Sequence, residues 1–468
     1  MTRPRDRKLG GLSQQVADWV VEAPYSDIPP ETVEFTKGLL LKTVASMVSG
    51  SEEPLGRTVL EHARASGGVP EVGVVSGNFR SNVETASFAN GVLAHATEME
   101  DAYFFPNREA VATCWIFPAI LSLAEKLHSS GEEVIAAAVF SFEIASRLAR
   151  AAPGMAFSLG INTATWFGVP AAAAAASRLL KMNPEQTRNA MAIAASQSAG
   201  LGRQIGTDAH TLESGHSCRA GVSSALLARA GATGVPDVLE GGPLLYGPVW
   251  ESGTVDLHTI SDGLGAPPFD IVKVEFKKYP GCGYLHAPVD ALVMLLEQEG
   301  VAFDEVEVVE IEVGIVAAKF CDRVFPETMA AARFSLSFAL AEVLLRGRLD
   351  CSSFRDEKKL FDARFRDAQR RVKLIASHDP AVNPEGCRVA VVKKNGQRFD
   401  RELVAFRGHP DNPLTLEETK RVLRPLFEPV IEEDRRIPIE NMVLGLEGLQ
   451  DIRPLMELLT FPRGREQV

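Results

Sequence analysis

The sequence has no closely spaced cysteine pair and no long apolar run. Its six cysteines are single residues far apart, so neither a disulfide framework nor a CxxC zinc site is expected. No stretch of about 18 apolar residues predicts a membrane span. The basic N-terminal segment MTRPRDRKLGGLSQQ lacks the apolar stretch of a signal peptide. We therefore expect a cytoplasmic protein with reduced thiols and no membrane contact.

The common cofactor-binding and hydrolase motifs are also missing. The sequence contains no Walker A motif, no GxSxG and no HExxH, and its nine histidines include no pair at metal-ligand spacing on one helix. The segment GLGRQIG (200–206) follows a predicted helix rather than a strand, which argues against a dinucleotide-binding loop. We therefore expect cofactor-independent chemistry, without a metal, or no catalysis.

Charge excludes one class of partner and leaves another open. A net charge of -12 argues against non-specific nucleic-acid binding. It does not argue against a small anionic substrate, because a pocket can be locally basic on an acidic protein.

The length and the residue pattern predict two domains. A chain of 468 residues with 46% hydrophobic and 24% charged residues is typical of a folded protein larger than one core. Residues 11–260 are helical in pattern and rich in alanine, which predicts closely packed helices. The pattern changes near Phe269, and helical periodicity returns after GHPDNP. We predict a mainly α protein with an inserted α+β domain: 1–268 and 408–468 form the helical domain, and 269–407 the α+β domain.

Local signals support these boundaries. Ser130 with Glu133 and Thr415 with Glu418 have capping-box spacing. The helix after Asn183 is expected to run to Gly200. VEVVEIEVG (306–314) alternates as a half-buried strand does. Asn395-Gly396 favours a type I′ hairpin turn between two strands.

Several segments, taken together and in order, resemble the MmgE/PrpD family. They are ANGVLAHATEMEDAY, GVPAAAAAASRLLKMNPEQTRNAMAIAASQSAGL, HTLESGHSCRAGVSSALLARAG, FKKYPGCGYLHAPVDA and ARFSLSFALA. The family includes 2-methylcitrate dehydratase, cis-aconitate decarboxylase and iminodisuccinate epimerase. The resemblance implies a helical domain with an inserted α+β lid domain, a homodimer, and a carboxylate-rich substrate in the cleft between the domains.

The sequence departs from the family pattern at positions that carry chemistry. Glu98 stands at an aspartate position, Ala102 at a threonine position, and Arg108 near a histidine position. Asn162 and Glu213 stand at histidine positions, and His210 at a lysine position. Lys277, Cys282 and His286 keep the family residues.

Removal of a proton next to a carboxylate requires a base and cations that hold the developing negative charge. Histidine titrates near neutral pH and a phenol can donate a proton, which suggests His210 and Tyr103 as base and acid. The predicted catalytic residues are His210, Lys277, Tyr103, Glu98 and His286. The predicted substrate-binding residues are Arg108, Arg203, Gln204, Asn162 and Asp101.

Each assignment has a structural alternative. Glu98 and Asp101 also fit a solvated helix edge, Tyr103 an interface aromatic, and Arg108 a surface ion pair. His210 also fits a helix cap and Lys277 an exposed strand end. Arg203 also fits a helix C-terminus, Asn162 a turn, and Cys282 and His286 the positioning of the helix that follows PGCGYLHAP. His95 stands between two alanines, and we predict a hydrogen-bonded imidazole in the core.

The sequence therefore predicts a cofactor-independent lyase, of dehydratase or decarboxylase type, for a small di- or tricarboxylate. Two alternatives stay open: an isomerase or epimerase with two bases, and a catalytically inactive relative that binds a ligand or partner.

Overall fold

The computed structural model describes residues 11–105, 110–154, 160–241, 255–382 and 385–461. Arg108, one of the predicted substrate-binding residues, lies outside the described residues. The described part of the chain is mainly helical and contains three small sheets. This confirms the predicted class, mainly α with a smaller α+β part. None of the helices in these ranges combines the length and apolar content that a membrane span requires.

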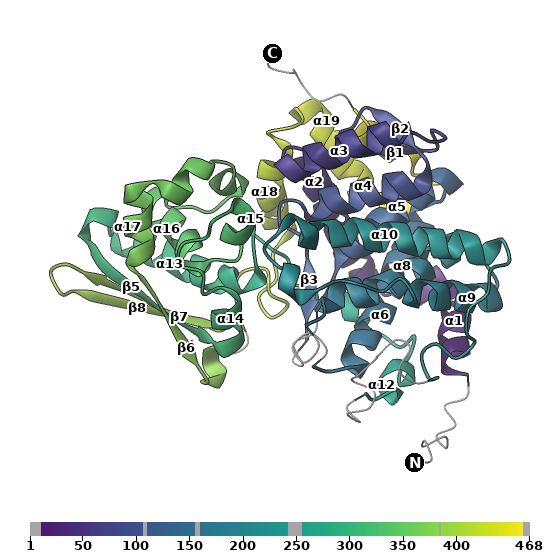
Figure 1. Ribbon diagram of the computed structural model, residues 1–468, viewed down its shortest axis with the longest axis horizontal. Coiled ribbons are helices and arrows are strands. Elements are labelled where there is room, and N and C mark those ends of the chain that lie inside the picture. Colours follow the sequence, from purple (N-terminus) through teal and green to yellow (C-terminus); the bar gives the residue numbers. More distant parts are fainter. Residues whose placement is uncertain (1–10, 106–109, 155–159, 242–254, 383–384, 462–468) are drawn as a thin grey trace.

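Most helices form one large bundle, which lies apart from a smaller α+β body (Figure 1). The bundle contains α1 (Leu12–Glu22), α2 (Pro30–Gly50), α3 (Pro54–Ser66), α4 (Val83–His95), α5 (Phe117–Leu127), α6 (Gly131–Ala151), α8 (Thr163–Leu179), α9 (Pro184–Ala195), α10 (Asp208–Arg229) and the short α12 (His258–Ser261). Two small hairpins join it: β1 (Val72–Val74) with β2 (Phe79–Ser81), and β3 (Ala102–Phe104) with β4 (Ala110–Ala112). Helix α10 packs against α4, α8 and α9 and is central to the bundle.

Small residues let the central helices approach closely. The alanine-rich part of α8 is buried, as the composition predicts. A Cβ added to Gly221 would lie 2.4 Å from the Cβ of Ala172, and a Cβ added to Gly215 would lie 2.5 Å from the carbonyl oxygen of Phe88. The second contact lies where α10 crosses α4, about one and a half helical turns from His210. Glycine at 215 therefore sets the spacing of the two helices that carry the polar cluster described below.

The α+β body is built on a four-stranded sheet with strand order β6-β5-β7-β8. Strand β5 (Val306–Gly314) pairs in parallel with β6 (Val372–Ser377) and antiparallel with β7 (Cys387–Lys393), which pairs with β8 (Arg398–Leu403). Helices α13 (His286–Glu299) and α16 (Leu336–Arg346) pack on the sheet. The body also contains α14 (Ile315–Phe320), α15 (Met329–Ala332) and α17 (Ala363–Arg370).

The buried apolar side chains form two clusters. One contains residues of the bundle together with the C-terminal helices α18 (Leu416–Phe427), α19 (Glu433–Leu444) and α20 (Arg453–Leu459). The other lies between Cys282 and Phe406. The chain passes between the two bodies twice, first through residues 267–281 and again through residues 406–415.

The local sequence signals correspond to observed elements, with one difference. Both capping boxes are present at α6 and α18, and Asn395-Gly396 forms the β7–β8 turn. Alternation in 306–314 places Val309, Ile311 and Val313 inward. The helix after Asn183 ends at Ala195 rather than at Gly200. There Gln197 and Ser198 turn their side chains to Ser224 and to the carbonyl of Trp166, contacts made outside the helix.

Substitution of Gly215 by alanine tests the close crossing of α4 and α10. The added methyl group overlaps backbone atoms of α4, so the variant is expected to lose roughly 1–3 kcal/mol of stability. Gly38→Ala is the matched control, because Gly38 is helical and a Cβ there meets no atom within 4 Å. That change is expected to stabilise by up to about 1 kcal/mol. Thermal unfolding of both variants measures the difference, and equal midpoints would contradict the close crossing.

Candidate active site

A buried polar cluster begins where α4 ends. The chain leaves the helix after His95, and Glu98 adopts a left-handed conformation with φ 55°. Such a backbone is uncommon for a residue with a side chain and is strained unless its surroundings hold it. Here the carbonyl of Glu98 accepts a hydrogen bond from the N–H of Gly281, in the segment that enters the α+β body. The turn therefore directs the side chains of residues 95–101 inward rather than to a solvated edge.

Two histidines and a glutamate meet in this cluster. The rings of His95 and His210 lie 4.8 Å apart, centroid to centroid, and Trp115 covers His95 at 4.5 Å. Oε1 of Glu98 lies 3.3 Å from Nε2 of His95 and 3.9 Å from Nε2 of His210. All four side chains are at least nine-tenths buried. Two imidazoles and a carboxylate are thus within contact distance and shielded from water.

Contacts at Nδ1, on the side of the ring away from Glu98, hold the ring of His210 in place. Its Nδ1 lies 3.3 Å from the side-chain amide of Asn162 and 3.6 Å from the carboxylate of Glu213. Glu213 also accepts hydrogen bonds from Asn162, from Thr165 and from the backbone N–H of Leu201. Burial opposes ionisation of Glu213, but His210, the N–H of Leu201 and the amide of Asn162 outweigh burial and lower the pKa of Glu213. The anchored ring presents Nε2 to Glu98, as a general base or acid requires.

Lys277 brings a buried positive charge to the same place. Its ammonium donates to the carbonyl of Glu98 at 3.3 Å and forms an ion pair with the carboxylate of Glu100. Burial disfavours the ammonium, but the carboxylates of Glu100 and Glu98 outweigh burial and raise the pKa of Lys277. Lys277 is therefore a fixed cation and not an exposed strand-end residue.

Asp101 joins α2 to the segment around Lys277. It forms a buried ion pair with Lys42 at 3.2 Å and accepts the backbone N–H of Lys277 at 2.9 Å. Burial raises the pKa of Asp101 to about 6, and burial also lowers the pKa of Lys42. These contacts give Asp101 a positioning role beside the cluster.

The α+β body contributes an arginine and a phenylalanine. Arg333 donates to the carbonyl of Ala96 and forms an ion pair with Glu53 at 2.7 Å. The ring of Phe334 lies 6.0 Å from that of His210, edge to face. Residues of both bodies therefore enclose the cluster.

Several polar atoms of this enclosed region have no hydrogen-bond partner. In the segment 95–101 they are Nδ1 and Nε2 of His95, Oγ1 of Thr97, Oε2 of Glu100 and Oδ2 of Asp101; Nε of Arg333 is another. A buried polar group without a partner costs about 1–3 kcal/mol. Such atoms concentrated in one place are expected where a polar ligand supplies the missing partners.

Three predicted residues make their contacts elsewhere. The half-buried ring of Tyr103 packs on Phe105 at 4.0 Å, and Nζ of Lys273 lies 5.8 Å from its centroid. Gln204 bonds to Thr207, and Arg203 is exposed. Among the described residues, none of the three contacts His95, Glu98 or His210. The structure therefore brings together His210, Lys277, Glu98 and Asn162, with Asp101 beside them, but not Tyr103, Arg203 or Gln204.

His286 is buried but faces its own turn. Its Nε2 accepts the N–H of Tyr279 at 3.2 Å, and Nδ1 lies 3.0 Å from the carbonyl of Gly283. Burial first, and then the charge of Lys277, hold the pKa of His286 well below its usual value. A neutral imidazole with both nitrogens bound to backbone stabilises the turn at the start of α13, which is the structural alternative stated for it above.

Sequence reasoning missed four contributors: His95, Glu100, Glu213 and Arg333. His95 is buried as predicted, but it faces carboxylates instead of forming ordinary core hydrogen bonds. Those carboxylates, Glu98 and Glu100, outweigh burial and raise the pKa of His95. Two features of the sequence could have indicated these residues. His95 lies in the AHATEMEDAY segment, and Glu213 lies in a segment that resembles a family motif.

The described residues also contain two groups with the composition of a metal site. One is His95, Glu98 and His210; the other is Glu275, Glu385 and His409. A histidine pair on one helix would not indicate either group, because the residues of each group come from separate segments of the chain.

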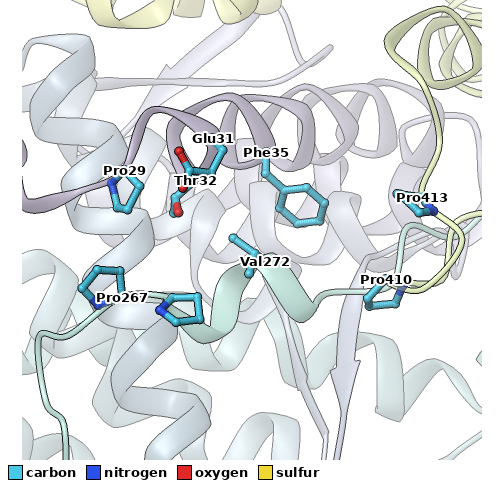
Figure 2. Close-up of a pocket in the computed structure, with 9 residues that line it drawn as sticks. Pro29, Glu31, Thr32, Phe35, Pro267, Val272, Pro410 and Pro413 are labelled. Atoms are coloured by element: carbon cyan, nitrogen blue, oxygen red, sulfur yellow. The ribbon is translucent and has the colours of Figure 1, made fainter.

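A distinct hollow of about 520 Å³ lies away from the cluster. Figure 2 shows Pro267 and Val272 of the entering connection and Pro410 and Pro413 of the returning connection facing α2. Its lining residues include the carboxylate of Glu31 and no cation. It therefore lacks the donors that a carboxylate ligand requires.

Comparison with known proteins agrees with this arrangement. The MmgE/PrpD N-terminal domain matches residues 14–255, and the MmgE/PrpD C-terminal domain matches residues 279–447. The chain belongs to the MmgE/PrpD family.

Similar curated proteins span nearly the whole chain. A cis-aconitate decarboxylase-like protein of Aspergillus oryzae is 27% identical, over 96% of this chain and 98% of its own length. The cis-aconitate decarboxylase of Aspergillus terreus is 25% identical, over 97% and 96%. The human cis-aconitate decarboxylase is 26% identical, over 81% and 79%.

The ion pair of His95 with Glu98 predicts a pH-dependent stability difference. Because folding raises the pKa of His95, the pair stabilises the fold fully below the ordinary imidazole pKa of about 6.5. This stabilisation is lost as the pH rises through the folded-state pKa. Glu98→Gln is therefore expected to lower the unfolding midpoint more at about pH 6 than at about pH 9. An equal loss at both pH values would contradict protonation of His95.

Proposed function

We propose that the chain is a lyase that eliminates water or carbon dioxide from a small di- or tricarboxylate bound at the buried cluster. The observation that carries this proposal is the set of unpartnered polar atoms around His95, next to the fixed charge of Lys277. Membership in the MmgE/PrpD family and similarity to proteins named cis-aconitate decarboxylase support the reaction type.

The free donors favour an anionic ligand. An ammonium has three N–H donors, and Lys277 uses two of them, on Glu98 and Glu100, among the described residues. Nε of Arg333 and Nδ1 of His95 have no partner either. Charge-assisted hydrogen bonds from such donors bind carboxylates strongly. The free oxygens of Glu100 and Asp101 suit a hydroxyl or a protonated group of the same ligand.

The two histidines have complementary environments. The carboxylate of Glu98 keeps His95 protonated, so His95 acts as the acid that protonates a leaving hydroxyl or a carbanion. His210 acts as the base through Nε2 in the tautomer whose Nδ1–H faces the carboxylate of Glu213. Lys277 stabilises negative charge on the substrate as the bond breaks. These steps need only the side chains of this chain.

Substrate entry requires opening of the cluster. Its side chains are enclosed by Trp115 and Thr165 from the bundle and by Arg333 and Phe334 from the α+β body. We propose that substrate enters when the enclosing residues of the bundle and those of the α+β body move apart. Closure then removes water, which strengthens the electrostatic contacts.

Turnover by the purified full-length chain tests the proposal. Incubation with cis-aconitate and with 2-methylcitrate is expected to yield carbon dioxide or an unsaturated acid from one of them. His210→Gln is expected to reduce kcat by roughly 10²–10⁴-fold, the usual range for loss of a general acid or base. His216→Gln is the matched control on the same helix, since His216 contacts the carbonyl of Gln197 outside the cluster.

The same incubations in deuterated water, with iminodisuccinate added to the set, separate the alternatives. Exchange of a substrate C–H with solvent, without loss of water or carbon dioxide, would indicate a two-base isomerase. Neither turnover nor exchange with any of the three compounds would contradict the proposed reaction for this substrate class and favour an inactive relative.

A further inference from the structure

Three potential ligands from separate segments meet where the two connections pass the α+β body. Glu275 belongs to the entering connection, Glu385 precedes β7, and His409 belongs to the returning connection. One ligand atom from each lies within 4.8 Å of those of the other two. Nε2 of His409 is 3.4 Å from Oε2 of Glu385. Two carboxylates and an imidazole from residues far apart in the sequence therefore converge on one point.

The carboxylate of Glu275 is buried beside a second carboxylate and has no direct ion pair among the described residues. Its side chain is in a residue only 4% exposed, and no basic side chain of the described ranges forms an ion pair with it. Its polar neighbour at this point is the second carboxylate, Glu385. Two carboxylates held together in a buried place need a proton or a cation between them.

The imidazole is already oriented toward the two carboxylates. At its outer nitrogen, Nδ1 of His409 lies 3.1 Å from the backbone N–H of Asp411 and 3.6 Å from the carboxylate of Asp411. In the structure Nδ1 accepts the N–H of Asp411, so metal binding at Nε2 requires the proton to move to Nδ1, where the carboxylate of Asp411 lies close enough to accept it.

We propose that Glu275, Glu385 and His409 form a binding site for a divalent metal ion of the zinc or manganese class. One imidazole and two carboxylates are ligands that these ions accept, and water completes the coordination. The ion neutralises the paired carboxylates and links both connections to the segment that begins strand β7. Figure 2 shows that the same two connections face α2 through their prolines. The metal therefore fixes the geometry between bundle and α+β body, at a place separate from the buried cluster.

Metal binding to the full-length chain, freed of metal with EDTA, tests the site. Calorimetric titration with Zn²⁺ is expected to give one equivalent that binds to wild type. Glu275→Gln and, separately, the less buried Glu385→Gln are each expected to weaken this binding at least tenfold. Glu98→Gln is the matched control because it alters the other group with metal-site composition, and it should leave the binding unchanged.

A second measurement distinguishes a folding defect from a lost ligand. Zn²⁺ should raise the unfolding midpoint of wild type and of Glu98→Gln, but not that of Glu385→Gln, whose midpoint without metal should stay close to wild type. Absence of zinc binding would overturn the site and indicate a shared proton between the carboxylates. Binding that persists in both Glu275→Gln and Glu385→Gln but is lost in Glu98→Gln would also overturn it.

Discussion

The ammonium of Lys277, buried between bundle and α+β body, is the interaction on which the site depends. A buried charge is tolerated only with close partners, and Lys277 has the carbonyl of Glu98 and the carboxylate of Glu100. Both lie in the turn after α4, whereas Lys277 lies in the entering connection. The same turn and connection are also joined by the Glu275–Ala102 and Gly281–Glu98 backbone hydrogen bonds. The charge therefore ties the end of a bundle helix to the segment that leads into the second body.

Three departures from the family pattern form one network. Asn162, His210 and Glu213 each replace a family residue, and in the structure they contact one another through Nδ1 of His210. Glu98, another departure, faces Nε2 of the same ring at 3.9 Å. A histidine at the lysine position needs an orienting partner on one side and a charged partner on the other. These replacements supply both, which favours a remodelled site over a degraded one.

Much of the fold followed from local sequence, because caps, turns and strand alternation depend on residues a few positions apart. The Ser130–Glu133 box and the Asn395-Gly396 turn are examples. The site followed less well. Family motifs pointed to His210, Lys277 and Glu98, but the contact of Glu98 with His95, which raises the pKa of His95, depends on an unusual backbone conformation at Glu98.

Long-range contacts were the least predictable. Arg333 reaches the carbonyl of Ala96 across 237 positions, and no spacing rule indicates such a pair. Tyr103 and Arg203 were chosen for their chemistry and their place near the motifs. The β3–β4 hairpin and the exposed turn before α10 direct them to other surroundings. The chemistry of a side chain and its proximity to a motif are therefore insufficient to predict a site residue where a turn determines which side chains point inward.

The central claim is that the buried cluster around His95 binds a carboxylate substrate. A crystal structure of the protein with a non-reactive tricarboxylate such as tricarballylate tests it most directly. The account predicts a carboxylate within hydrogen-bond distance of Lys277 and of the free nitrogens of His95 or Arg333. Density for the ligand in the proline-lined hollow beside α2, with the cluster unchanged and empty, would contradict it.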